Sequence, residues 1–182
     1  MAIDSLENPA HPFRTPVLGT VEQGACRLRT VILRGANPVR RQLLCYTDSR
    51  SGKARQIQAD ARTSWHFYHT EEKLQMRARG KTSTHVHDEL ANTHWKGIGA
   101  RGRKDYAALL APGSRAPHPT RAVPKTPGEG PSAEDLAYAF KNFMVLCTTV
   151  TELDLLLLHP DGHQRVGARW ENDHWAYSWI VA

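Results

Sequence analysis

The sequence lacks the features that mark a membrane-bound or secreted protein. Its 182 residues contain no apolar run near the roughly 18 residues that a membrane-spanning helix needs. The segment Met1–Asn8 has no basic region followed by an apolar run, so we expect no secretory signal. The three cysteines, Cys26, Cys45 and Cys147, are odd in number and widely spaced, which argues against a disulfide framework. We therefore expect a cytoplasmic protein with buried, reduced thiols.

Recognised catalytic and metal-binding motifs are also missing. The sequence contains no G-x-S-x-G elbow, no Walker A loop and no H-E-x-x-H pair. None of its ten histidines joins a cysteine or carboxylate at a ligand spacing, so we expect no metal site. RNA-recognition signatures are absent as well, and Trp65, Phe67 and Tyr68 have the spacing of a sheet core instead of a nucleic-acid platform. A site for a small molecule remains.

Positive charge is in excess and is concentrated in one stretch. The chain has a formal net charge of +6 and a pI of about 9.5. Arg27–Arg55 holds eight basic residues against one acid, Asp48, so its net charge of +7 leaves the remainder close to neutral. Such a run is often only a solvated face, and charge alone fits nucleic acid, an anionic membrane or a phosphorylated small molecule. The hydroxyl-rich residues 46–51 favour a binding site over a merely soluble loop.

Local signals inside this stretch predict a hairpin followed by a short helix. The apolar runs Thr30–Leu33 and Gln42–Thr47 flank the turn-forming residues Gly35–Pro38. Ser51 is then placed to cap the N-terminus of a helix over residues 52–59.

The start of this helix is a candidate anion site. A helix N-terminus offers free backbone N–H groups and the positive end of the helix dipole. Lys53 lies in the first turn, and Thr47, Ser51 and Arg29 add hydroxyl and guanidinium donors. The sequence therefore predicts a phosphate-sized site formed by these side chains and the helix N-terminus.

Strand patterns dominate the rest of the chain. Further strands are predicted over Val17–Val21, from Cys26 onward, and over Thr63–His69, Leu74–Gly80, Phe143–Val150, Glu152–His159, Gln164–Glu171 and Trp175–Val181. Short helices are predicted over Val86–Ile98, Gly102–Leu110 and Ser132–Ala139, and residues 112–131 form a loop rich in proline and glycine. The pattern predicts one mainly β domain over residues 1–182, an antiparallel barrel or sandwich with helical insertions.

Four stretches of the sequence resemble the pyridoxamine 5′-phosphate oxidase-like family of FMN-binding split barrels. They are R-T-V-I-L-R-G from Arg29, Y-T-D-S-R-S-G-K-A-R-Q-I from Tyr46, Q-M-R-A-R-G-K from Gln75, and the tail E-L-D-L-L-L-L-H-P-D-G-H-Q-R-V-G-A-R from Glu152. The resemblance implies an antiparallel split β-barrel, FMN as cofactor, oxidoreductase activity, and a homodimer with FMN at the subunit interface.

The resemblance also implies roles for individual residues. The FMN phosphate would be held by Arg29, Thr47, Ser51 and Lys53. The flavin edge would be lined by the backbone of Thr30, Val31 and Ile32 and by Tyr46. Gln75 would form a hydrogen bond to the ring, and Arg169 would come from the partner subunit. Arg34 stands at a further position of the cofactor site, and Arg34 and Arg165 are what remains of the substrate site. Arg169 or Arg77 would supply positive charge beside the ring.

Several positions depart from the family pattern. The full-length oxidases have lysine where this chain has Arg34, arginine at Gly52, tryptophan at Leu156–Leu158 and histidine at Gly167. Their substrate-phosphate cluster has no clear match among Trp95–Ile98. The cofactor residues are mostly kept and the substrate residues mostly lost. We therefore expect an FMN-binding oxidoreductase for an unidentified small substrate; the alternatives are a genuine pyridoxamine or pyridoxine 5′-phosphate oxidase and a non-catalytic flavin-binding protein.

Overall fold

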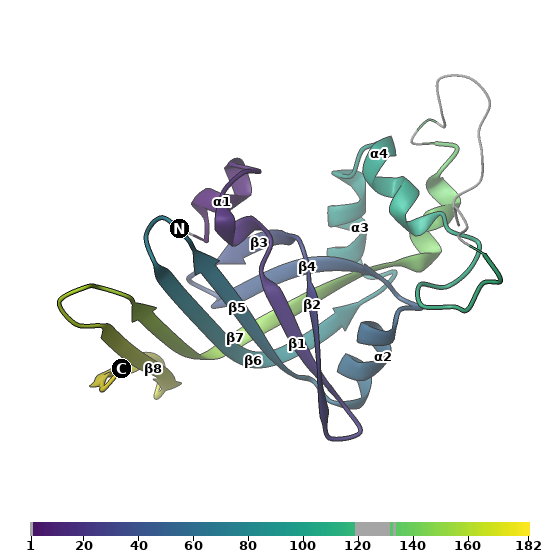
Figure 1. The fold of residues 1–182 in the computed structure, drawn as a ribbon. Coiled ribbons are helices and arrows are strands. Elements are labelled where there is room, and N and C mark those ends of the chain that lie inside the picture. The colour runs from purple at the N-terminus through teal and green to yellow at the C-terminus, as the bar shows by residue number, and fades with distance from the viewer. Residues whose placement is uncertain (1, 119–131, 133) are drawn as a thin grey trace. The chain divides into compact units, whose positions relative to one another are not determined.

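The computed structural model describes residues 2–118, 132 and 134–182 (Figure 1). The chain divides into two compact units, which are described separately below. The sheet unit comprises Met1–Cys45, Asp60–Ser83 and Cys147–Ala182. The helical unit comprises Tyr46–Ala59 and Thr84–Leu146.

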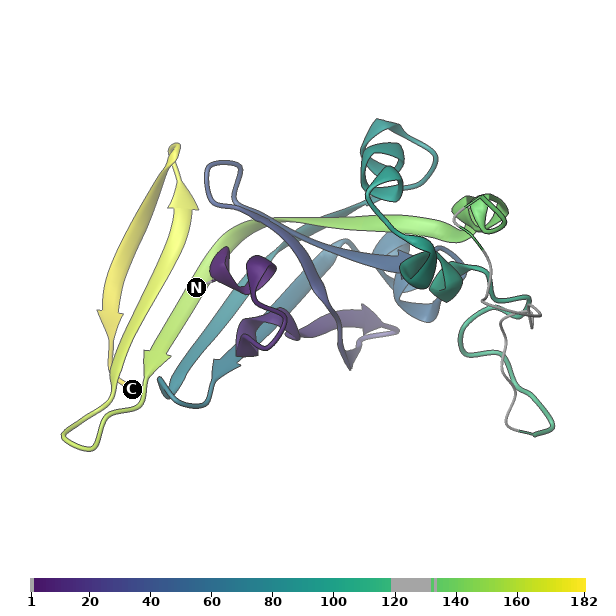
Figure 2. The ribbon, with the colours of Figure 1, turned by 90° about the horizontal axis from the view of Figure 1, so that it is seen from above.

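Antiparallel strands make up most of the sheet unit. The strands are β1 (Val17–Glu22), β2 (Ala25–Thr30), β3 (Leu33–Asn37), β4 (Gln42–Asp48), β5 (Arg62–His69), β6 (Leu74–His85), β7 (Phe143–Leu157), β8 (Gln164–Glu171) and β9 (His174–Ile180). Their order is β2-β1-β5-β6-β7-β4-β3, and β8 pairs with β7 and β9. Figure 2 shows β8 and β9 as a hairpin beside the end of β7. The predicted mainly β, antiparallel class is confirmed.

The core of the sheet unit follows the alternation of β5. Trp65 and Phe67 are each 1% exposed, and the indole Nε1 of Trp65 donates to Thr148 Oγ1 at 2.9 Å. Phe13 packs against Phe67, with ring centroids 5.2 Å apart. The prediction of a sheet core is confirmed for Trp65 and Phe67 and wrong for Tyr68, which is 41% exposed because neighbouring residues of a strand face opposite sides.

The predicted hairpin forms with shifted boundaries. Its first strand is β3, so Gly35–Asn37 are strand residues and not the turn. The turn lies over Pro38–Arg41, where the Arg41 amide donates to the Pro38 carbonyl at 3.3 Å and Arg41 has φ 56°. The predicted strand over Thr30–Leu33 does not form as one strand, because Thr30 ends β2 and Leu33 begins β3. Val31 and Ile32 connect the two strands, and the Val31 amide donates to the carbonyl of Pro16 at 2.9 Å.

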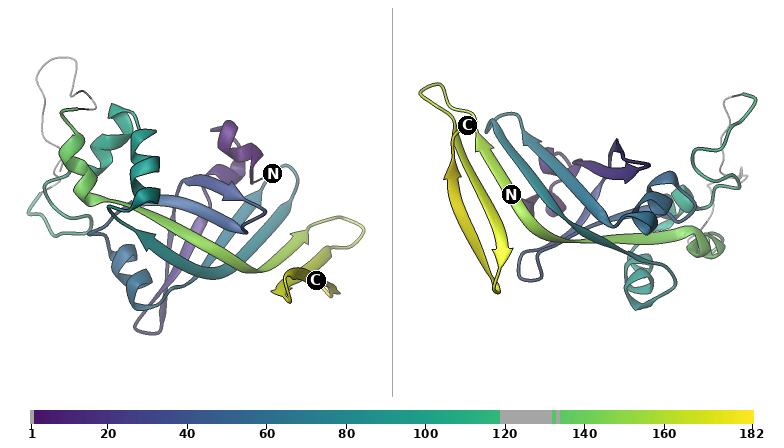
Figure 3. Two further views of the ribbon diagram at one scale, coloured as in Figure 1. Left: turned by 180° about the vertical axis from the view of Figure 1, so that it is seen from behind. Right: turned by 90° about the horizontal axis from the view of Figure 1, so that it is seen from below.

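The C-terminal region has one strand fewer than predicted. Phe143–Val150 and Glu152–His159 are a single strand, β7, whose length is visible in Figure 3. No glycine, proline or other turn signal interrupts the chain at Thr151, so the strand continues. At Gly80 of β6, an added Cβ would overlap the Thr149 carbonyl oxygen of β7, so the close approach of the two strands at this point requires a glycine.

The helices are short. They are α1 (Asp4–Glu7), α2 (Gly52–Ala59), α3 (Glu89–Lys96) and α4 (Ala100–Arg103), with 3₁₀ turns η1 (Pro12–Arg14), η2 (Lys104–Tyr106) and η3 (Ala137–Asn142). The predicted bounds of α2 are confirmed. Asp88 caps α3, because its Oδ1 accepts from the Ala91 amide at 2.9 Å, so this helix starts later than the predicted Val86.

Two other helix predictions need correction. The helix predicted over Gly102–Leu110 starts earlier, as α4, and ends as a 3₁₀ turn at Tyr106. The helix predicted over Ser132–Ala139 is the 3₁₀ turn η3, whose six residues begin only at Ala137. Most of the predicted loop over residues 112–131 lies outside the described residues; residues 112–118 contain no helix or strand.

The cysteines are only partly buried. Cys45 and Cys147 are buried as predicted, whereas Cys26 is exposed, because it lies on the edge strand β2. All three are free thiols. Among the described residues, no helix has the length and apolar character needed to cross a membrane.

Candidate functional site

The residues predicted to form the site come from both units. The helical unit holds Tyr46, Thr47, Ser51 and Lys53, and the sheet unit holds Arg29, Thr30, Val31, Ile32, Arg34, Gln75, Arg165 and Arg169. Within the helical unit, three of the predicted residues meet, and we call Thr47, Ser51 and Lys53 the anion clamp.

The anion clamp gathers hydrogen-bond donors at the start of α2. Lys53 Nζ donates to Thr47 Oγ1 at 2.9 Å, and Thr47 Oγ1 lies 3.0 Å from Ser51 Oγ. Thr47 and Ser51 are only 4% and 3% exposed. Because α2 begins at Gly52, its first free amide groups lie beside these side chains. An ammonium, two hydroxyls and a helix N-terminus form the donor set that a phosphate monoester requires.

The backbone of Ser51 starts the helix while its hydroxyl belongs to the clamp. The Ser51 carbonyl accepts from the amides of Ala54 at 3.1 Å and Arg55 at 3.3 Å, as expected of the residue before the helix. Its Oγ contacts Thr47. The predicted helix start is therefore correct, and the hydroxyl lies where it can serve an anion.

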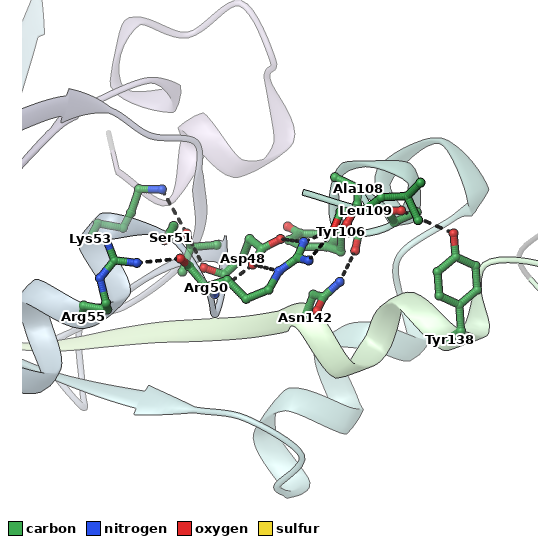
Figure 4. A network of polar contacts seen from close by, with 12 residues as sticks. Asp48, Arg50, Ser51, Lys53, Arg55, Tyr106, Ala108, Leu109, Tyr138 and Asn142 are labelled. Carbon is green, nitrogen blue, oxygen red and sulfur yellow. Dashed lines mark hydrogen bonds and ion pairs between the residues drawn. The ribbon is translucent and has the colours of Figure 1, made fainter. Parts of the chain in front are cut away.

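Sequence reasoning missed two sets of residues in the helical unit. The Tyr46 hydroxyl lies 2.8 Å from His94 Nδ1, and burial lowers the pKa of His94. Asp48 and Arg50 form a two-bond ion pair within the loop that carries the clamp (Figure 4). The spacing D-x-R was a signal in the sequence for the pair Asp48 and Arg50, whereas nothing in the sequence linked Tyr46 to His94.

In the sheet unit, Arg29 is fixed to its own hairpin. Its Nη1 donates to Thr20 Oγ1 at 2.6 Å, to the Leu18 carbonyl at 3.2 Å and to the Arg27 carbonyl at 2.9 Å. Burial lowers its pKa. The guanidinium is therefore held in place without any ligand.

The three residues after Arg29 differ in exposure. Thr30 is exposed, Val31 is 7% exposed and Ile32 is 45% exposed. Arg34 is exposed and lies at a β-bulge, since Leu33 pairs with Cys45 and Gly35 with Leu44. A bulge redirects a side chain relative to its strand, which makes Arg34 the least regular of the predicted positions.

Two rows of charge cross β6, β7 and β8, and we call them the arginine rows. In the first, Asp154 accepts from Arg77 and Arg165, each with an Nη2 to Oδ2 distance of 2.8 Å. Burial acts to raise the pKa of Asp154, but hydrogen bonds from Arg165 and Arg77 outweigh it, and the pKa is lowered. Arg165 thus has a carboxylate partner within its own chain.

In the second row, Glu152 lies between Arg79 and Arg169. The nitrogen-to-oxygen distances are 3.6 Å and 3.5 Å. Both arginines are more exposed than those of the first row, with side chains 62% and 64% exposed. These contacts are weaker, because solvent screens exposed ion pairs.

A cavity of about 300 Å³ lies beside the arginine rows. Gly167 lines it together with Arg77, Asp154, Arg169 and Ile180. A Cβ at Gly167 would come within 2.8 Å of Ile180 Cδ1, so the glycine keeps space open. Gln75, on the same strand as Arg77, has its side-chain Oε1 3.1 Å from His66 Nε2.

One protein-family model matches part of the chain. Residues 2–86 match the family model described as pyridoxamine 5′-phosphate oxidase, FMN-binding domain. The matched residues, a little under half of the chain, are similar to this FMN-binding domain, and the match supports FMN as the cofactor. Comparison with the curated proteins found no match.

Solved structures extend the likeness of fold to nearly the whole chain. A pyridoxamine 5′-phosphate oxidase-related, FMN-binding protein from Nostoc punctiforme is 22% identical, with a TM-score of 0.73 over 93% of this chain and 87% of that one. PhzG from Burkholderia lata, solved with tetrahydrophenazine-1-carboxylic acid, is 13% identical, with a TM-score of 0.71 over 98% and 87%. A protein related to general stress protein 26 from Clostridium acetobutylicum is 10% identical, with a TM-score of 0.53 over 97% and 91%. The fold is the split barrel.

The residues of the clamp fit the cofactor of this family. FMN carries a phosphate monoester, and the clamp brings two buried hydroxyls and an ammonium to a helix N-terminus. Its residues lie within seven consecutive positions, so the fit depends on local geometry alone.

Proposed function

We propose that the protein is a cytoplasmic FMN-dependent oxidoreductase that acts on a small molecule other than pyridoxamine 5′-phosphate. The observation that carries the proposal is the anion clamp, in which Thr47 lies within hydrogen-bond distance of both Lys53 and Ser51 at the start of α2. It supports FMN over riboflavin, because only FMN has the phosphate that uses these donors.

Each group of predicted residues has its own task. The anion clamp binds the phosphate, together with Arg29. The backbone of Thr30–Ile32 and the Tyr46 ring orient the flavin, and Gln75 bonds to it. When bound, FMN supplies hydride transfer, and the protein supplies binding, orientation and charge. Arg169 contributes positive charge from the partner subunit.

The cavity at Gly167 supports a substrate different from the vitamer phosphate. A histidine, the residue that the resemblance leads us to expect, would fill part of this space. Arg165 already has a carboxylate partner, Asp154, which it shares with Arg77. Of the expected substrate residues, Arg34 and Arg165 alone remain, and losing several positioning groups costs many orders of magnitude in rate.

An exposed apolar surface supports a twofold dimer. The register pairs Val166 with Trp179, Ala168 with Tyr177 and Trp170 with Trp175, so these side chains share one face of the β8–β9 hairpin. Tyr177 and Trp179 are 75% and 73% exposed. Large aromatic residues exposed together mark an interaction surface, and a second copy of the chain can present the same face.

The dimer is tested at Trp179. Trp179→Lys places a charge in the proposed interface, so sedimentation should show dimers for the wild type and monomers for the variant at micromolar concentration. Val39→Lys, at a position 88% exposed in the turn between β3 and β4, is the matched control and should stay dimeric. A wild-type monomer that binds FMN with full stoichiometry would contradict the proposal.

The activity is tested with the FMN-loaded protein. Pyridoxine and pyridoxamine 5′-phosphates should give little or no peroxide or pyridoxal phosphate. Turnover of about 1 per second or more, ordinary for an enzyme, would show that it is a genuine oxidase. Failure of every hydride donor tried to bleach the bound flavin would support the alternative, a flavin-binding protein without turnover.

A further inference from the structure

The loop that carries the anion clamp is tied to a distant segment of the helical unit through Arg50. Its guanidinium binds Asp48 with two bonds, Nε to Oδ1 at 3.0 Å and Nη2 to Oδ2 at 2.7 Å. The Arg50 amide also donates to Asp48 Oδ1 at 2.8 Å. Asp48 is only 5% exposed, so this pair is shielded more than a surface ion pair. The pair fixes the loop between Thr47 and Ser51.

Arg50 also donates to two carbonyls, those of Ala108 and Leu109, within residues 106–109, which we call the carbonyl run (Figure 4). Four consecutive carbonyls there accept side-chain hydrogen bonds: Tyr106 from Asn142 Nδ2 at 2.8 Å, Ala107 from the Tyr138 hydroxyl at 3.3 Å, Ala108 from Arg50 Nη2 at 2.9 Å, and Leu109 from Arg50 Nη1 at 3.4 Å. Only Tyr106, the last residue of η2, belongs to a helix. The run is therefore held largely by side chains, two of its bonds coming from Arg50.

A second link joins the same loop to this segment. The Ser49 amide donates to the Asn142 carbonyl at 2.7 Å, and the Asn142 side chain binds Tyr106. Asn142 is 5% exposed. The clamp loop thus contacts the carbonyl run both directly, through Arg50, and through a buried asparagine.

The pair Asp60 and Arg62 shows that the D-x-R pattern alone does not create this link. Arg62 binds Asp60 with the same two-bond geometry, at 3.0 Å and 2.6 Å, and its amide donates to Asp60 Oδ1 at 3.0 Å. The described hydrogen bonds of the Arg62 side chain go to Asp60 alone, and it is 76% exposed. Arg50 differs from Arg62 because its side chain also donates hydrogen bonds to the carbonyls of Ala108 and Leu109, which lie 58 and 59 residues further along the chain.

We propose that Arg50 is a positioning residue that couples occupancy of the anion clamp to the order of the carbonyl run. The inference rests on the proposed FMN site. A phosphate held by Thr47, Ser51 and Lys53 restricts the loop between them, and the fixed guanidinium then holds Ala108 and Leu109 more tightly. Coupling of this kind is reciprocal, so ordering of the carbonyl run also favours phosphate binding.

The coupling depends on the shape of the guanidinium and not on its charge. The planar fork makes bonds to a carboxylate and two carbonyls at once, which an ammonium cannot reproduce. Arg50→Lys therefore keeps the charge and loses the coupling. Arg62→Lys makes the same exchange in the matching pair and leaves the coupling unchanged.

Hydrogen exchange of the peptide 104–111 tests this proposal in the full-length protein saturated with FMN, saturated with riboflavin, or without flavin. Both flavins have the ring, and only FMN has the phosphate. We expect FMN to slow exchange in this peptide about fivefold or more relative to riboflavin, the lower end of ordinary coupling. In Arg50→Lys and Arg50→Gln the difference should vanish, while Arg62→Lys should retain it.

Each outcome separates this inference from the proposed function. Equal protection by FMN and riboflavin in the wild type, or an FMN-specific difference that persists in both Arg50 variants, would overturn the coupling while leaving FMN binding intact. A protein that binds neither flavin would overturn both proposals. If neither Arg50 variant folds, the wild-type comparison of the two flavins still decides the case.

Discussion

The anion clamp and the arginine rows are both polar, but they are built in different ways. The clamp comes from residues 47–53, one strand end and the first turn of a helix, and its side chains are neutral hydroxyls and one ammonium. The arginine rows come from three strands, with residues 77–79, 152–154 and 165–169, and each carboxylate lies between two arginines. The clamp contains no carboxylate and is thus suited to accept an anion, whereas each arginine of the rows already has a carboxylate partner.

This difference predicts where a mutation affects binding and where it affects stability. Removal of a clamp donor removes a partner of the ligand. Removal of a carboxylate from an arginine row leaves two guanidiniums without their common partner.

Lys53→Ala should weaken FMN binding most. The loss of a hydrogen bond to a charged group costs about 1.5–3 kcal/mol, which corresponds to roughly 10- to 150-fold in Kd. Titration of the flavin-free protein, followed by flavin fluorescence, measures the change. Lys96→Ala removes an exposed lysine of the same unit, at the end of α3, and should leave the Kd unchanged. An unchanged affinity in Lys53→Ala would place the phosphate elsewhere.

Asp154→Asn should lower stability by about 1–2 kcal/mol, because two charge-assisted bonds are lost at a partly shielded site. Urea unfolding measures this change in the free energy of unfolding. Asp161→Asn is the control, since the Asp161 side chain is 91% exposed. FMN affinity of the refolded variant should change less than in Lys53→Ala. A larger loss of FMN affinity in Asp154→Asn than in Lys53→Ala would contradict the contrast between the anion clamp and the arginine rows.

The Asp154 carboxylate should also make the stability of the fold sensitive to acid. Its pKa is lowered in the folded protein, so it contributes stability above the ordinary pKa near 3.8, and this contribution is lost as the pH falls through the lowered value. The wild type should therefore lose more stability than Asp154→Asn as the pH falls below about 4. Parallel stability curves for the two proteins across that range would rule out the ion pair as a source of stability.

Gly167→Ala should have the smallest effect. An added Cβ meets Ile180 Cδ1, and the Ile180 side chain is 41% exposed and can rotate away, so the expected loss is about 1 kcal/mol or less. Gly99→Ala, with no atom within 4 Å of the added Cβ, is the control. Thermal unfolding measures both. Gly167→His should fill the cavity further and reduce turnover of any substrate that uses it, with FMN affinity retained.

The sequence predicted those parts of the site whose residues lie close together along the chain. The bounds of α2 and the meeting of Thr47, Ser51 and Lys53 follow from a strand end, a capping position and a first turn within seven residues. Strand alternation likewise placed Trp65 and Phe67 in the core. These features depend on neighbours in sequence, which a pattern records directly.

The remainder depends on contacts between distant residues. Asp154 as partner of Arg165, His94 beside Tyr46, and Arg50 on the carbonyls of Ala108 and Leu109 join residues 11, 48, 58 and 59 positions apart. A single sequence contains no signal for such pairs. The same reason explains the strand errors, because the continuity of β7 and the bulge at Arg34 depend on pairing across the sheet.

We expect the anion clamp to bind the phosphate of FMN. The most direct measurement is the ratio of riboflavin to FMN dissociation constants for the wild type and for Lys53→Ala, obtained by titrating the same flavin-free preparations with each flavin. We expect a large ratio in the wild type that falls about tenfold or more in the variant, because only FMN loses a bond. Equal affinities for FMN and riboflavin in the wild type would contradict it.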